Sequence, residues 1–79
     1  MLTLYVKTGC PFCRKVLDTG EDLGIVFEEK NIADDAVAAE LALRGGKRQV
    51  PYLVDSKREV EMYESDDINT YLREQYAKQ

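Results

Sequence analysis

The residues best suited to chemistry are two cysteines, Cys10 and Cys13, in the sequence Cys-Pro-Phe-Cys. Residues three apart on a helix lie about 5–6 Å from one another, which is a distance that a disulfide bridges. The pair can therefore cycle between dithiol and disulfide, a chemistry that is typical of this spacing beside a strand–helix–strand unit. The chain has no histidine, so a reactive thiolate must form without a histidine base.

The helix expected after the first cysteine decides which thiol reacts. Pro11 suits the first position of a helix, where its missing N–H is no loss. Cys10 would then precede the helix and be exposed, whereas Cys13 would lie one turn in and be more buried. A helix N-terminus stabilises a thiolate, so we expect Cys10 to be the nucleophile and Cys13 the resolving thiol. Nearby basic residues favour the same anion: Lys7, Arg14 and Lys15.

Two other interpretations of the cysteine pair are a structural metal site and a pair of inert thiols. Two cysteines without histidine cannot complete a four-ligand zinc site within one chain, and we expect no metal site. A disulfide that closes so short a loop would add little stability. The junction between strand and helix, with proline inside the motif, favours the redox interpretation.

The elements that must position these cysteines follow from the apolar periodicity and the turn residues. Leu2, Leu4 and Val6 alternate with polar or amphipathic residues and predict a strand. The whole pattern predicts the order βαβα-ββα, an α/β thioredoxin-type fold with a four-stranded mixed sheet flanked by three helices. The expected strands cover residues 2–6, 25–32, 52–54 and 60–63, and the helices run from Pro11 to a C-cap at Gly24, from Ala33 to Leu43, and from a cap at Ser65 along an apolar face of Ile68, Tyr71, Leu72 and Tyr76.

The dipeptide Val50-Pro51 precedes an apolar strand. A trans proline at a strand start is the ordinary interpretation. In a chain that also carries Cys-Pro-Phe-Cys, the alternative is a cis proline in a loop that faces the cysteines. The backbone N–H and C=O of Val50 would then be free to pair with an extended thiol substrate.

The segment at Ser65 and Asp66 has two interpretations as well. Serine followed by acidic residues is an ordinary helix N-cap. The functional interpretation is that the backbone N–H groups of Ser65 and Asp66 receive a carboxylate, while an aspartate side chain receives an ammonium group.

Three stretches together resemble the glutaredoxin family, and the similarity runs over nearly the whole chain. They are residues 5–13, which contain Cys-Pro-Phe-Cys, residues 49–52 (Gln-Val-Pro-Tyr) and residues 64–67 (Glu-Ser-Asp-Asp). Glutaredoxins typically carry Cys-Pro-Tyr-Cys, so Phe12 is a mild variant. The resemblance implies a thioredoxin fold and binding of the tripeptide glutathione.

The resemblance also implies which residues hold glutathione. Lys7, three residues before the first cysteine, would pair with the glycyl carboxylate. Val50 would pair main chain with the glutathione cysteine, and Ser65 and Asp66 would hold the γ-glutamyl end. Gln49 and Arg48 would add side-chain contacts to the carboxylates. The full set of expected glutathione-binding residues is Lys7, Phe12, Gln49, Val50, Pro51, Ser65 and Asp66.

One segment departs from the glutaredoxin pattern. Many glutaredoxins carry Gly-Gly before the last helix, and this chain has Tyr63-Glu64. Glu-Ser at a helix start looks instead like the glutathione site of glutathione S-transferase N-terminal domains. Glutathione binding is expected under either comparison. We expect no transferase activity, because no helical second domain follows in this sequence.

The expected function is therefore glutathione-dependent thiol–disulfide exchange. Glutathione would be a co-substrate, with no permanently bound cofactor, and the substrates would be glutathionylated or disulfide-bonded proteins. An alternative is a redoxin reduced by thioredoxin reductase, which shares the fold and the motif. A further alternative is an iron–sulfur carrier with glutathione ligands; Pro11 argues against it, because cluster-binding relatives more often have a small residue there.

Length, charge and hydropathy limit the other classes of protein to which this chain could belong. The 79 residues suffice for one domain, which we expect to span residues 1–79 as a single glutaredoxin domain. The net charge of −4 argues against nucleic-acid binding. No apolar run has the length of a signal peptide or a membrane span. We expect a cytoplasmic monomer.

Overall fold

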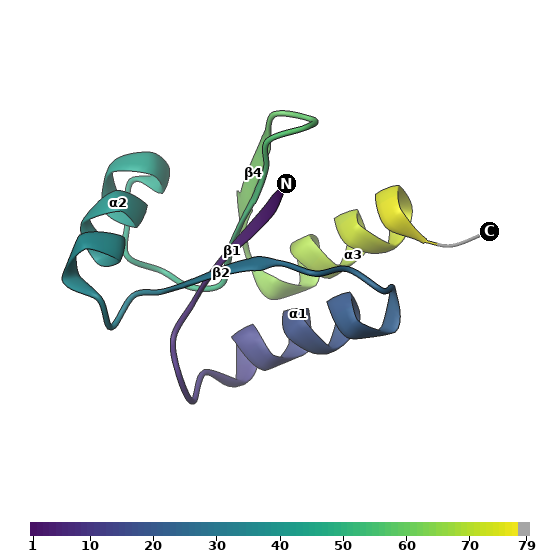
Figure 1. Cartoon of the computed structure of the whole chain (residues 1–79), viewed down its shortest axis with the longest axis horizontal. Coiled ribbons are helices and arrows are strands. Elements are labelled where there is room, and N and C mark those ends of the chain that lie inside the picture. Colours follow the sequence, from purple (N-terminus) through teal and green to yellow (C-terminus); the bar gives the residue numbers. More distant parts are fainter. Residues whose placement is uncertain (78–79) are drawn as a thin grey trace.

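The computed structural model describes residues 1–77 as a four-stranded sheet with three helices (Figure 1). The order of elements is the expected βαβα-ββα. Their bounds are β1 (Leu2–Val6), α1 (Pro11–Asp22), β2 (Glu28–Asn31), α2 (Asp35–Gly45), β3 (Tyr52–Asp55), β4 (Val60–Tyr63) and α3 (Ser65–Tyr76).

The sheet is mixed, as expected, with strand order β2-β1-β3-β4. β1 pairs with β2 in parallel, with Thr3 opposite Glu28. β1 pairs with β3 in antiparallel fashion through Leu4 and Leu53, and β3 pairs with β4 through Leu53 and Met62. The first strand is therefore central, and its C-terminal end leads directly into the cysteine motif.

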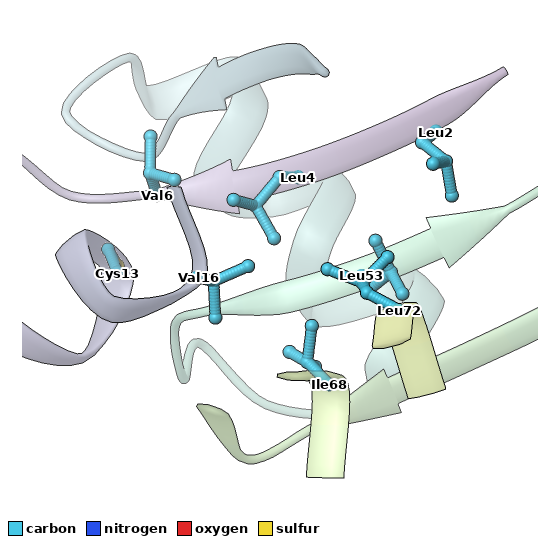
Figure 2. Close-up of a cluster of buried hydrophobic side chains, with 8 residues drawn as sticks. All are labelled: Leu2, Leu4, Val6, Cys13, Val16, Leu53, Ile68 and Leu72. Carbon is cyan, nitrogen blue, oxygen red and sulfur yellow. The ribbon is translucent and has the colours of Figure 1, made fainter. Parts of the chain in front are cut away.

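The main core lies between the sheet and the two helices α1 and α3, which lie side by side in Figure 1. Figure 2 shows side chains from the sheet and from both helices pointing into one apolar cluster. Burying one such side chain contributes about 1.5–3 kcal/mol, so this cluster holds α1, and the cysteines at its start, against β1. Its members are Leu2, Leu4, Val6, Cys13, Val16, Leu53, Ile68 and Leu72.

The opposite face of the sheet is covered by α2 alone, which lies apart from the other two helices in Figure 1. Leu41 of α2 packs there with Tyr5, Tyr52 and Val54. The hydroxyl of Tyr5 donates a hydrogen bond to Glu40 on the same helix. Alternation along β1 thus places leucine and valine toward α1 and α3, and Tyr5 toward α2.

The second strand is shorter than the predicted 25–32, because β2 begins at Glu28. Gly24 has a φ of +73°, and the Ile25 amide bonds back to the Gly20 carbonyl at 2.8 Å. Residues 25–27 therefore form the exit from the helix and not a strand. Gly24 itself follows the actual C-cap, Leu23, of a helix that ends at Asp22.

The other two helices also differ from their predicted starts. The side chain of Asp34 accepts a hydrogen bond from the Ala36 amide at 2.9 Å, so Asp34 is the N-cap and α2 begins at Asp35, not at 33. This helix continues past 43 to Gly45. In α3, Glu64 occupies the N-cap position without a side-chain cap bond, and Ser65 is the first helical residue.

Within residues 1–77, no helix combines the length and the apolar character needed to cross a membrane.

Candidate functional site

Cys10 is the N-cap of α1, between the end of β1 and the first helical turn. Gly9 has a φ of +80°, a conformation that glycine adopts without strain, and it turns the chain from strand to helix. The Cys10 amide donates to the Lys7 carbonyl at 3.2 Å. The backbone N–H of Cys13 points at the Cys10 Sγ at 3.3 Å. The first thiol therefore sits where a helix offers its free N–H groups.

The surroundings of Cys10 favour its thiolate. Burial raises the pKa of the Cys10 thiol, but hydrogen bonds from the Cys13 thiol and from the Cys13 and Phe12 amides, with the charge of Lys7, outweigh burial and lower this pKa below its usual value. Each of these groups interacts more strongly with an anion than with a neutral thiol.

Cys13 has the opposite environment. Its side chain is 2% exposed and belongs to the main core. Burial, followed by the hydrogen bond with Cys10, raises the pKa of Cys13 to about 11. Both cysteines are free thiols. The site thus holds a half-buried thiol of lowered pKa and, beneath it, a buried thiol of raised pKa, with the burial difference that the sequence predicted.

Cys10 opens into a hollow of about 470 Å³, which we call the cysteine hollow. Polar and apolar residues both line it, and both cysteines contribute. It is lined by Val6, Lys7, Thr8, Gly9, Cys10, Pro11, Cys13, Arg14, Leu17, Glu29 and Asn31.

A second hollow of about 280 Å³ lies beside Phe12; we call it the proline hollow. It is lined by Phe12, Gln49, Val50, Pro51, Glu64 and Ser65. Five of these six are predicted glutathione contacts, drawn from three distant parts of the chain. The bond between Val50 and Pro51 is cis, the alternative that the cysteine motif had favoured.

Two predicted contacts, Lys7 and Asp66, lie outside the proline hollow. Lys7 lines the cysteine hollow and not the proline hollow. Asp66 lines neither; its exposed carboxylate is 3.9 Å from the Lys15 ammonium. Phe12, by contrast, lines the proline hollow as expected and is 56% exposed.

Two residues that the sequence marked only as a departure bind the segment before the cis proline. Glu64 has a φ of +73°, which a non-glycine residue rarely adopts, and accepts a hydrogen bond from the Gln49 amide nitrogen at 2.8 Å. The Tyr63 hydroxyl donates to the Lys47 carbonyl at 2.7 Å. Such strained positions concentrate at functional sites, and only the replacement of Gly-Gly by Tyr63-Glu64 pointed to them.

Asn31 is a further residue that sequence analysis missed. Its side-chain nitrogen donates to the Thr8 hydroxyl at 2.9 Å, and its side-chain oxygen accepts from the Ala33 amide at 2.9 Å. It thereby ties the loop that carries Cys10 to the end of β2. Asparagine is a common turn residue, and Asn31 at the end of β2 was the available clue.

Among residues 1–77, no group of three or more histidine, cysteine, aspartate or glutamate side chains is arranged to hold a metal ion. The polar groups around Cys10 are instead two cations, Lys7 and Arg14, one carboxylate, Glu29, and the amide of Asn31. This set can hold an anion near a thiolate.

Comparisons with known proteins agree with the architecture. A family model described as "Glutathione S-transferase, N-terminal domain" matches residues 4–79. A delta-class glutathione transferase from Nilaparvata lugens superposes with a TM-score of 0.83 at 28% identity, over 100% of this chain and 38% of that one. A glutathione S-transferase from the clam Laternula elliptica gives a TM-score of 0.76 at 32% identity, over 95% of this chain and 35% of that one.

Among curated proteins, the hybrid peroxiredoxin hyPrx5 of Haemophilus influenzae is 30% identical over 70 residues. That match covers 89% of this chain and 28% of the relative. The chain therefore spans less than two fifths of the length of these relatives. The thioredoxin-like fold expected from the sequence is confirmed, and the neighbouring structures are glutathione S-transferases and not specifically glutaredoxins.

Proposed function

This chain belongs to the glutathione S-transferase N-terminal domain family, a group within the thioredoxin superfamily, and from that premise we propose that residues 1–79 act as a glutathione-dependent thiol–disulfide oxidoreductase. Cys10 is the nucleophile and Cys13 the resolving thiol. One observation carries the proposal: a stabilised thiol at the helix N-cap faces a buried thiol of raised pKa one turn away. Conjugation of glutathione to an electrophile needs no second cysteine, whereas the reduction of protein disulfides uses both.

Glutathione is the proposed co-substrate, and the proline hollow supports this choice. Val50 and Gln49 line it, as does Ser65 at the start of α3. The N–H groups that begin a helix are suited to a carboxylate. Asp66, one residue on and 90% exposed at its side chain, is the proposed partner of the ammonium group. The relatives named glutathione transferases support the same ligand.

The first reaction begins when the Cys10 thiolate attacks the glutathione sulfur of a protein–glutathione mixed disulfide. A new S–S bond forms between Cys10 and glutathione as the old one breaks, and the protein sulfur leaves with the electron pair and takes a proton from water. A second glutathione thiolate then attacks the glutathione sulfur on Cys10. Oxidised glutathione leaves, and the Cys10 thiolate is regenerated.

Protein disulfides follow a related route that uses both cysteines. Cys10 forms the mixed disulfide with the substrate protein. Cys13 then loses its proton and attacks the Cys10 sulfur, the bond between Cys10 and the substrate sulfur breaks, and the substrate sulfur leaves with the electron pair and takes up a proton. Two glutathione molecules then reduce the Cys10–Cys13 disulfide. The hybrid peroxiredoxin among the relatives makes the disulfide of a thiol peroxidase a sensible test substrate.

The decisive experiment supplies the pure protein with a glutathionylated peptide and reduced glutathione, and follows oxidised glutathione through glutathione reductase. Thioredoxin reductase runs in parallel as the alternative reductant, and 1-chloro-2,4-dinitrobenzene tests for conjugation. Turnover with glutathione alone supports the proposal. Turnover only with thioredoxin reductase, or conjugation without disulfide exchange, overturns it.

A further inference from the structure

Two hollows flank the segment from Cys10 to Phe12, and their linings share no residue. The proline hollow contains most of the expected glutathione contacts, whereas the cysteine hollow contains both thiols. A mixed disulfide carries one substituent on each sulfur, and both must be accommodated when Cys10 attacks. The glutathione assignment accounts for the proline hollow and uses only Lys7 in the larger cysteine hollow, most of which it leaves without an occupant.

The chemistry of the cysteine hollow is distinct from that of the protein as a whole. The chain carries a net charge of −4, yet this hollow has two cations, Lys7 and Arg14, against one carboxylate, Glu29. Within residues 1–77, Lys7 takes part in no ion pair. The Nε of Arg14 pairs with Asp18 at 3.1 Å, which leaves further guanidinium donors on the same side chain.

The hollow also has an apolar side. Val6, Pro11 and Leu17 line it next to the cations. A peptide segment that fits would therefore place an aliphatic side chain on this surface and a carboxylate near Arg14. Arg14 is the cation that the glutathione assignment does not use.

We propose that the cysteine hollow receives the leaving protein segment of the mixed disulfide and selects cysteines flanked by acidic residues. This inference rests on the proposed function, because it concerns the second substituent of the same substrate. Arg14 is the specificity-determining residue. Electrostatic selection of this kind acts on how often the substrate peptide meets the protein and on how it is oriented there. It weakens as salt screens the charges.

The test is a single-turnover transfer of glutathione from a peptide to the Cys13→Ser protein. Two glutathionylated peptides differ only in having glutamate or lysine on both sides of the cysteine, and each carries a tryptophan tag. The protein has no tryptophan, so chromatography with fluorescence detection follows the released peptide alone. The selectivity ratio is also measured at steady state with the native dithiol protein, which covers the case in which Cys13→Ser folds poorly.

We expect the glutamate peptide to react about fivefold faster at low ionic strength, with the ratio falling toward one as salt increases. The net charge of the protein alone favours the lysine peptide, so the two explanations predict opposite signs. Arg14→Gln should reduce the ratio to about one, and Arg14→Glu should reverse it. Asp18→Asn is the matched control, because it breaks the same ion pair but keeps the cation, and it should preserve the preference. Lys57→Gln, which removes a distant cation, should do the same.

Equal rates for the two peptides, or faster reaction of the lysine peptide, would overturn this inference and leave the glutathione chemistry standing. A preference that survives Arg14→Glu would overturn the role of the hollow. If neither peptide transfers glutathione to Cys10, the proposed function fails, and the inference fails with it.

Discussion

The backbone nitrogen of Cys13 lies 3.3 Å from the Sγ of Cys10. The main chain at position 13 therefore donates a hydrogen bond to the Cys10 sulfur whatever side chain that position carries. The Cys13 thiol adds a further hydrogen bond that lowers the pKa of Cys10. Substitutions at position 13 separate these two contributions.

Cys10→Ser should abolish both the glutathione reaction and protein disulfide reduction, because no nucleophilic sulfur remains at the helix start. Cys13→Ser should keep transfer from mixed disulfides and lose reduction of protein disulfides, since the backbone donor persists while the resolving thiol is gone. Coupled glutathione reductase assays and an insulin reduction assay measure the two activities. Full disulfide reduction by Cys13→Ser would contradict this division of roles.

The pH dependence of thiol reactivity should show two distinct cysteines. The pKa of Cys10 is lowered and that of Cys13 is raised to about 11, so alkylation near neutral pH should modify Cys10 alone. Its rate should level off at a pH below that for an ordinary cysteine, whose pKa is about 8.5. Lys7→Gln should move the profile to higher pH, because it removes a positive charge. The measurement is iodoacetamide labelling from acid to alkaline pH, read by mass spectrometry.

Asp55 should make the free energy of unfolding depend on pH in the acid range. This fully buried carboxylate accepts hydrogen bonds from the hydroxyls of Tyr71 at 2.7 Å and Tyr76 at 2.6 Å. Burial raises the pKa of Asp55, but these bonds, with those from the Arg58 and Lys57 amides, outweigh burial and lower it. A lowered pKa gives stability that is present above the unfolded value of about 3.9 and is lost as pH falls through the folded value.

Asp55→Asn should therefore reduce the free energy of unfolding by about 2–4 kcal/mol at pH 7. Because the charge is already gone, the variant should lose less further stability than the native protein as pH falls below about 4. Urea unfolding at neutral and acid pH measures both effects. Asp18→Asn, on an exposed ion pair, is the control and should change stability by less than about 1 kcal/mol. A similar small change in Asp55→Asn would refute the buried network.

Gly20 should tolerate no side chain. It is a buried residue of α1, and a Cβ placed there would collide with the Phe27 ring. Alanine gains about 1 kcal/mol of helix propensity over glycine, but crowding of a packed site costs about 1–3 kcal/mol. We expect Gly20→Ala to be destabilised in thermal unfolding, and Phe27→Leu in the same chain to restore part of the loss. Unchanged stability in Gly20→Ala would show that the ring moves aside freely.

The order of the elements and the difference in burial between Cys10 and Cys13 could be predicted, because both depend on local signals in the sequence. Alternation predicted β1, and proline after Cys10 predicted the start of α1. The predicted strand at residues 52–54 stopped short of Asp55, yet Asp55 ends β3 and is buried. Its two tyrosine partners lie on α3, 16 and 21 residues away, and no local pattern reports such a pairing.

For the site, likewise, the sequence predicted some of the residues that come together but not the contacts between them. Residues 49–51 and Ser65 were placed together only through a family resemblance, and the structure brings them into one hollow. The hydrogen bond between Gln49 and Glu64 could not be predicted, because it requires the fold that carries two loops to one point. The placement of Lys7 in the other hollow likewise depends on how β1 turns into α1.

The strand order leaves β2 and β4 at the two open edges of the sheet. Each has only four residues, and the outer strand β2 carries Glu28, Glu29 and Lys30 in sequence. A second copy that added a strand here would have to strip water from these charged groups, which opposes edge-to-edge association. The charged residues of β2 thus oppose aggregation at the sheet edge that lies next to the reactive cysteine.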